Sequence, residues 1–309
     1  MNNIYVISVT FLAFIILYIY INVSSKQQKC NIIDDMDYPA LSVPDLSGIP
    51  IKDIIFKSAY NCCCVGGMKN DYVSLCALKN CYRAGARVLD MQIFSLNSEP
   101  VISASTVNQN EYKELYNYLG FSETMNHIKN TFLNTNMSPN NNELLCINLR
   151  INSNNKALYN KISNTLIETF TDRAQMLLPG DIDINKDLNT YSLNELKHKI
   201  IIMVDLNASP QFRDSFGSTD LSRLALITFG DGFKYHSLYA NEASLQSGVE
   251  LSSIYPNKTA YSNNYDYVDK GKRNKFNFIF MNFQKRDNHL TKYLDDFNSF
   301  SFKQVYNME

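Results

Sequence analysis

Residues 56–90 read FKSAYNCCCVGGMKNDYVSLCALKNCYRAGARVLD, and this stretch decides the fold. It starts in an apolar run, passes through a loop of small residues, continues with apolar positions at helical spacing and ends on Arg-Val-Leu-Asp. This order predicts a strand over 54–59, a helix over 72–83 and a second strand over 87–94. In such a βαβ unit, the loop after the first strand and the end of the second meet at one edge of a parallel sheet, where these folds place their sites.

The same alternation of strand and helix patterns continues to the end of the chain. Strands that are apolar throughout are typical of a parallel sheet covered on both faces. The sequence therefore predicts an α/β fold, a TIM-type (β/α) barrel, with a doubly wound sheet as the alternative. No glycine-rich nucleotide-binding loop is present. Further strands are expected over 101–104, 143–151, 199–206, 224–229, 277–282 and 302–306, with helices over 121–133, 156–170 and 290–297 and a helical turn over 193–196.

The N-terminal segment is the clearest topological feature. Residues 4–23 carry no charge and are mostly apolar, and about 20 such residues suffice to cross a bilayer as one helix. A cleaved signal peptide is the competing interpretation, but the run is too long for one and no basic region precedes it. We expect a short tail over 1–3, a transmembrane anchor over 4–23, a tether over 24–50 and the barrel over 51–309. Lys26 and Lys29 follow the span, so the positive-inside rule favours a cytosolic body.

Charge and cysteine content exclude several classes of function. The 29 Lys and Arg residues balance 30 Asp and Glu residues, which argues against a nucleic-acid partner. The seven cysteines form an odd set in a long chain, so we expect reduced thiols rather than disulfides. Cys62, Cys63 and Cys64 are adjacent and have no Cys-x-x-Cys pair nearby, which predicts buried thiols rather than a metal site.

A barrel places its functional residues at the carboxyl ends of its strands. Eight polar or aromatic residues occupy such positions in the predicted strands and the loops that follow them. They are Tyr60, Asn61, Asp90, Gln92, Ser105, Arg150, Asp205 and Asn282.

Several motifs in a fixed order identify a related family. Residues 57–61 read Lys-Ser-Ala-Tyr-Asn, residues 85–92 read Gly-Ala-Arg-Val-Leu-Asp-Met-Gln with Glu-Pro-Val at 99–101, and residues 281–284 read Met-Asn-Phe-Gln. In this order they resemble the X domain of phosphatidylinositol-specific phospholipase C, one of the PLC-like phosphodiesterases. The stretch over 195–201 is also similar to that family. The resemblance covers roughly residues 50–306 and implies a TIM-type barrel that cleaves phosphodiesters through a cyclic inositol phosphate.

The chain departs from the family at the positions that carry its chemistry. The resemblance implies two histidines as general base and general acid, but Tyr60 occupies the first position and the second falls near Ala104 and Ser105. Gln92 and Arg150 stand where active members carry ligands of calcium, so neither calcium nor another cofactor is expected. The histidines that are present are expected to be structural or on the surface; they are His127, His198, His236 and His289.

Two hypotheses about function follow. The first is a catalytically degenerate, membrane-anchored barrel that binds a membrane lipid, an inositol-phosphate-like ligand or a protein partner. The alternative is an active phosphodiesterase that cleaves a phosphatidylinositol-like or glycerophosphodiester substrate with Tyr60, Asp90 and Arg150 as catalytic groups. Asp90 and Arg150 could equally form a self-satisfied ion pair. The absent histidines favour the first hypothesis, whose further ligand-binding residues would be Asn61, Gln92, Ser105, Asp205 and Asn282.

Overall fold

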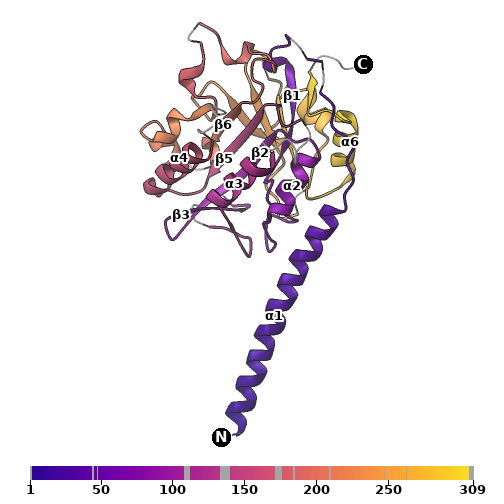
Figure 1. Ribbon diagram of the computed structural model, residues 1–309, viewed down its shortest axis with the longest axis vertical. Coiled ribbons are helices and arrows are strands. Elements are labelled where there is room, and N and C mark those ends of the chain that lie inside the picture. Colours follow the sequence, from indigo (N-terminus) through magenta and orange to yellow (C-terminus); the bar gives the residue numbers. More distant parts are fainter. Residues whose placement is uncertain are drawn as a thin grey trace.

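The computed structural model describes residues 2–43, 45–46, 48–107, 112–132, 140–170, 176–183, 185–208, 210–246, 248–261 and 263–305. A body of strands and helices carries a straight helix, α1 (Asn2–Asp34), that projects from one side of it (Figure 1). The predicted ends of one helix and one strand, Leu133 and Tyr306, lie outside the described residues.

Eight parallel strands form a nearly closed barrel, in the order β7-β6-β5-β2-β1-β10-β9-β8. A parallel bridge between Phe229 and Tyr235 joins the end of β7 to the residue before β8, which brings the two edges together. The TIM-type barrel is confirmed, and the doubly wound alternative is wrong because the two edge strands meet. The strands are β1 (Ile54–Ala59), β2 (Val88–Leu96), β5 (Leu145–Ile151), β6 (Ile200–Asp205), β7 (Ala225–Phe229), β8 (His236–Tyr239), β9 (Ser252–Tyr255) and β10 (Phe278–Met281).

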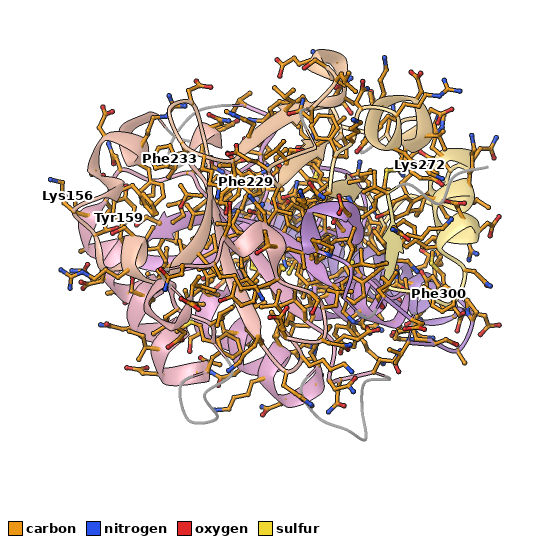
Figure 2. The ribbon with its side chains drawn as sticks, turned by 90° about the horizontal axis from the view of Figure 1, so that it is seen from above. Lys156, Tyr159, Phe229, Phe233, Lys272 and Phe300 are labelled. Carbon is orange, nitrogen blue, oxygen red and sulfur yellow. A yellow bond between two sulfur atoms is a disulfide. The ribbon has the colours of Figure 1, made fainter. Side chains whose placement is uncertain are left out.

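Helices cover the outside of the barrel because each turns one apolar stripe towards the strands. In α4 (Lys156–Phe170), for example, Leu158, Ile162 and Leu166 are fully buried. Figure 2 shows side chains filling the interior, with Lys156 and Lys272 on opposite flanks. The other helices and the short antiparallel strands are α2 (Leu75–Arg83), α3 (Phe121–Phe132), α5 (Pro210–Phe216), α6 (Asn288–Phe297), β3 (Glu99–Ser103), β4 (Leu119–Gly120) and β11 (Phe302–Gln304).

Most predicted elements appear within a few residues of their expected bounds. The predicted strand over 54–59 and the predicted helix over 156–170 have the observed bounds of β1 and α4. The helical turn expected over 193–196 is a hydrogen-bonded turn and not a helix. Strands β8 and β9 and helix α5 were not predicted, since none of them has a long apolar run.

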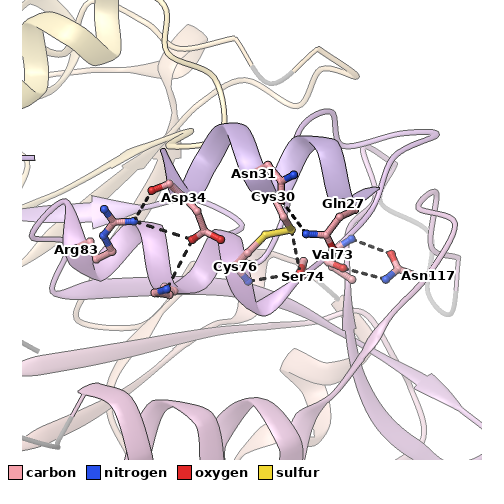
Figure 3. Close-up of a disulfide and its surroundings, with 10 residues drawn as sticks. Gln27, Cys30, Asn31, Asp34, Val73, Ser74, Cys76, Arg83 and Asn117 are labelled. Atoms are coloured by element: carbon pink, nitrogen blue, oxygen red, sulfur yellow. Dashed lines mark hydrogen bonds and ion pairs between the residues drawn. A yellow bond between two sulfur atoms is a disulfide. The ribbon is translucent and has the colours of Figure 1, made fainter. Parts of the chain in front are cut away.

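Helix α1 differs most from expectation. It continues past the apolar run to Asp34, so residues 24–34 are helical and not part of a tether. This extension brings Cys30 against Cys76 at the start of α2, and the two form a disulfide (Figure 3). The expectation of reduced thiols is therefore wrong for this pair. The remaining cysteines are free and buried; they are Cys62, Cys63, Cys64, Cys81 and Cys146.

The apolar part of α1 is long and apolar enough to cross a membrane by length and composition, with a mean hydropathy of 2.4 over its most apolar window. None of that window is buried against the body. The large apolar side chains between Tyr5 and Ile21 are mostly exposed, so an apolar surface such as a bilayer could cover them.

Candidate functional site

The candidate site lies at the mouth of the barrel, where the carboxyl ends of the parallel strands meet. Arg150 on β5 donates from Nε to Oδ1 of Asp90 at 2.7 Å and from Nη2 to Oδ2 of Asp90 at 2.6 Å. Its Nη2 also donates to Oδ1 of Asn61 at 2.7 Å, and its Nη1 donates to the hydroxyl of Tyr60 at 3.1 Å. Four of the predicted site residues therefore form one hydrogen-bonded group. We call Asp90 and Arg150 the mouth pair; Tyr60 and Asn61 are its two partners.

The mouth pair is fully enclosed and satisfied by its neighbours. Asp90 also accepts the backbone N–H of Asn61 at 2.9 Å and Nδ2 of Asn148 at 2.8 Å. The guanidinium of Arg150 lies over the ring of Tyr60 at 4.4 Å and over that of Tyr255 at 5.5 Å. Arg150 is 2% exposed and Asp90 is 0% exposed. Buried charges persist in a protein only when paired and hydrogen-bonded, and these two meet that condition within the chain itself.

Electrostatics leave Tyr60 unsuited to accept a proton near neutral pH. Burial raises the pKa of its phenol above the ordinary value, although the adjacent Arg150 acts in the opposite direction. The hydroxyl therefore stays protonated, and it accepts a hydrogen bond from the guanidinium. A general base needs a pKa near the working pH, so the geometry gives Tyr60 a packing role.

Besides Asn148, which bonds to Asp90, three further residues at the mouth were missed by sequence reasoning. Tyr239 ends β8, Tyr255 ends β9 and Lys258 follows β9. The Nζ atom of Lys258 lies 5.3 Å from the centre of the Tyr239 ring. Burial, with a contribution from Arg150, lowers the pKa of Lys258 to about 8. The signal that could have identified the two tyrosines is that each ends a short segment of β-strand character, and Lys258 follows the second of these segments.

The other predicted site residues do not join the mouth pair. The side chain of Gln92 accepts the N–H of Ser105 at 3.1 Å and donates to its carbonyl at 3.2 Å, so it is satisfied by the backbone of Ser105. The backbone N–H of Asn282 donates to the side-chain oxygen of Asn264, which lies earlier in the chain. Asp205 accepts the N–H of Asn207 at 2.9 Å, and burial raises its pKa.

The histidines lie away from the mouth pair. His236 begins β8 and His198 precedes β6, so both are at the amino ends of strands, opposite the mouth. His127 lies on α3, where burial lowers its pKa, and His289 is exposed on α6. All four positions fall within the described chain, and none makes a hydrogen bond to Asp90. Within the same residues, no group of three or more His, Cys, Asp or Glu side chains is arranged to hold a metal ion.

The barrel is similar in fold to several solved structures. No protein-family model and no curated protein sequence matches the chain. Among solved structures, PLC21 of L. pealei superposes with a TM-score of 0.64 at 12% identity, over 84% of this chain. PLC21 of S. officinalis gives 0.61 at 12% identity over 85%. This chain spans 38% of the length of each of those two proteins.

A smaller protein matches over its whole length. The calcium-dependent phosphoinositol-specific phospholipase C of a Gram-negative Pseudomonas sp. gives a TM-score of 0.55 at 9% identity, covering 87% of this chain and 100% of that one. Identities this low carry the fold and not the activity. The motifs, the closed parallel barrel and these superpositions agree, and the chain has the PLC-like phosphodiesterase fold.

Proposed function

We propose that the protein is a membrane-anchored, non-catalytic PLC-like barrel that binds a phosphate-bearing ligand at its mouth. The observation that carries this proposal is the mouth pair, in which both carboxylate oxygens of Asp90 are held by Arg150. An acid committed to two charge-assisted hydrogen bonds has little capacity left to move a proton in a reaction. The absence of a histidine at the mouth supports the same conclusion.

A phosphate ligand suits a cation at the mouth. Asp90 neutralises Arg150, and Lys258 is a further cation there: burial lowers its pKa to about 8, while Asp205 and Glu242 act in the opposite direction and favour its protonated form. Lysine binds phosphate as a compact point charge. The apolar span of α1 would hold the barrel at a membrane, where phosphate-bearing lipid headgroups are concentrated.

The residues at the mouth do not fit calcium. Calcium takes six to eight oxygen ligands, mostly from carboxylates and carbonyls. Here the carboxylate of Asp90 already faces the guanidinium of Arg150 at 2.6 Å, and a second cation would be repelled. We therefore propose that ligand binding needs no metal.

One observation favours the alternative, an active phosphodiesterase. A half-buried lysine with a pKa of about 8 releases its proton more readily than an ordinary lysine. Lys258 could then act as the general base for the attacking hydroxyl, with Arg150 facing the phosphate. In this case the reaction rate would rise with pH as Lys258 loses its proton.

Turnover and binding assays on the full-length protein in lipid nanodiscs separate the two functions. We expect no cleavage of phosphatidylinositol or glycerophosphodiesters, and saturable binding of inositol 1-phosphate. Lys258→Gln should weaken this binding about tenfold, the value of one charged hydrogen bond of about 1.5 kcal/mol. Lys156→Gln, an exposed lysine on α4, is the matched control. Turnover that Lys258→Gln abolishes would establish the alternative, and a complete lack of binding would refute the proposal.

A further inference from the structure

Helix α1 is fixed to the barrel and does not hang from it by a flexible link. The Cys30–Cys76 disulfide joins it covalently to α2. Lys29 forms an ion pair with Asp71 at 2.6 Å, and Asp71 also accepts the N–H of Gly67 at 2.8 Å. The buried side chains of Cys30 and Ile33 complete this junction. A covalent bond, a part-buried ion pair and an apolar contact within one turn of helix leave α1 a single orientation.

The contacts also define the direction in which α1 leaves the body. Cys30 meets Cys76 at the start of α2, and one turn later Asp34 lies 3.7 Å from Lys79. Further along, Arg83 at the end of α2 donates to the carbonyl of Asp34 at 3.1 Å (Figure 3). The two helices therefore run in the same direction.

This direction places the apolar span on the mouth side of the barrel, projecting outward from it. Helix α2 follows β1, so it starts near the carboxyl ends of the strands and runs back along the barrel. Since α1 runs parallel to α2, its N-terminal part extends beyond the mouth, as the projecting helix in Figure 1 shows. Residue 23 ends the apolar run and lies only about 10 Å along the helix axis from Cys30.

The loops around the mouth form a continuous rim that adjoins α1. The N–H of Met68 donates to Ala260 at 3.1 Å, and the N–H of Asn70 donates to Glu114 at 3.0 Å. The N–H of Tyr116 donates to the carbonyl of Asp71, the residue that also binds α1. Three loops from distant parts of the sequence are thus held together beside the span.

This rim exposes aromatic side chains of the kind found at bilayer interfaces. Tyr261 is 76% exposed, Tyr116 is 53% exposed and Tyr112 is 48% exposed. Lys69 stands beside them with half of its side chain in solvent. Tyrosine and lysine favour the headgroup region, where an apolar ring and a polar tip are both satisfied. We call the surface of Tyr112, Tyr116, Tyr261 and Lys69 the rim surface.

The disulfide also bears on the compartment. Its formation removes two protons and two electrons from the two thiols, and a disulfide-exchange protein of an oxidising compartment is the acceptor. Disulfides of this structural kind are rare in the cytosol. The lysines that favoured a cytosolic body are weaker evidence, because Lys29 is engaged by Asp71 at 2.6 Å.

We propose that the Cys30–Cys76 disulfide holds the barrel with its rim surface against the bilayer that contains α1, on the oxidising side of that membrane. The partner is the lipid surface itself. This inference rests on the anchor of the proposed function. It is opposite to the cytosolic orientation of the body that the positive-inside rule favoured. It also places the mouth next to the lipid headgroups of the same membrane.

Contact with the bilayer is tested with single tryptophans, since the chain contains none. Tyr261→Trp on the rim surface and Val43→Trp, 55% exposed beside Phe302 at the other end of the barrel, are compared. Each full-length variant is placed in nanodiscs of phosphatidylcholine with brominated chains, which quench nearby tryptophan. We expect loss of emission for Tyr261→Trp only, and a smaller loss when Cys30→Ser and Cys76→Ser are added. Equal emission from both tryptophans would overturn the orientation.

Compartment and anchor are tested on full-length protein synthesised into microsomes. We expect the body to be protected from added protease and five thiols to react with a maleimide after denaturation without reductant, corresponding to the five free cysteines. Digestion of the body together with seven reactive thiols would overturn the proposal. Mass spectrometry separates the causes of failure. Loss of the apolar segment refutes the anchor itself, whereas an intact chain with an unquenched Tyr261→Trp refutes only the orientation.

Discussion

Replacing Asp90 by asparagine tests whether the mouth pair is a structural element. Asparagine keeps the shape of the side chain but removes the charge that faces the buried guanidinium of Arg150 at 2.6 Å and 2.7 Å. Removing one partner of a buried ion pair destabilises a protein by about 3–5 kcal/mol. At about 2–4 °C for each kcal/mol in a domain of this size, we expect the melting temperature to fall by about 10 °C.

The same substitution should affect ligand binding in the opposite sense. Once Asp90 is neutral, the guanidinium of Arg150 lacks its internal anion, so a phosphate can take that place. Inositol 1-phosphate should therefore raise the melting temperature of Asp90→Asn more than that of the wild type. If Asp90 were instead a catalytic acid or base, this variant would lose turnover without gaining affinity.

The assay is thermal unfolding of the full-length protein in detergent, followed by the near-ultraviolet circular dichroism of its 20 tyrosines. Glu143→Gln is the matched control, because it breaks the other buried pair, Arg87 with Glu143 at 2.6 Å, at the start of β5. It should lower stability similarly and leave the effect of the ligand unchanged. A shift below about 2 °C for Asp90→Asn, less than 1 kcal/mol at this size, would refute the reasoning.

Three further changes are expected to alter stability in defined ways. Burial lowers the pKa of Lys57 to about 7, so the unfolded chain binds a proton that the native protein lacks between pH 7 and about pH 10. The wild type should gain stability across that range by calorimetry, whereas Lys57→Met should be more stable at pH 7 and lose this dependence. Gly66→Ala would place a methyl group against the carboxylate of Asp71, and urea unfolding should show a loss of about 1–3 kcal/mol. Cys30→Ser opens a crosslink between residues 46 apart and should cost about 4 kcal/mol by the chain-entropy relation, measured in the same way. An unchanged unfolding midpoint in Gly66→Ala or in Cys30→Ser would contradict the tight docking of α1.

The fold could be predicted because most barrel strands can be recognised from their apolar composition. Strand β6 is buried at every position, and α4 has one regular apolar stripe, so each carries its signal within its own residues. Strands β8 and β9 have four residues each and depend on pairing with each other. These two strands are formed by contacts between segments, and the sequence of each segment alone does not reveal such contacts.

The site could be predicted only in part for the same reason. Tyr60, Asp90 and Arg150 follow from strands that composition reveals, and their proximity was expected. Lys258 follows β9, so it was missed along with that strand. The disulfide was missed because it depends on α1 remaining helical beyond its apolar run, which places Cys30 beside Cys76.

The departures from the family pattern at the mouth compensate one another. An arginine at position 150 without a partner would leave a buried charge, which is strongly unfavourable. Tyr60, which the sequence resemblance matches to a histidine of that family, supplies both a hydroxyl acceptor at 3.1 Å and an aromatic face at 4.4 Å for that same guanidinium. A histidine there would bring a group that becomes cationic near neutral pH beside Arg150. The tyrosine and the arginine therefore suit each other better than either suits proton transfer, and this agrees with the non-catalytic mouth that we propose.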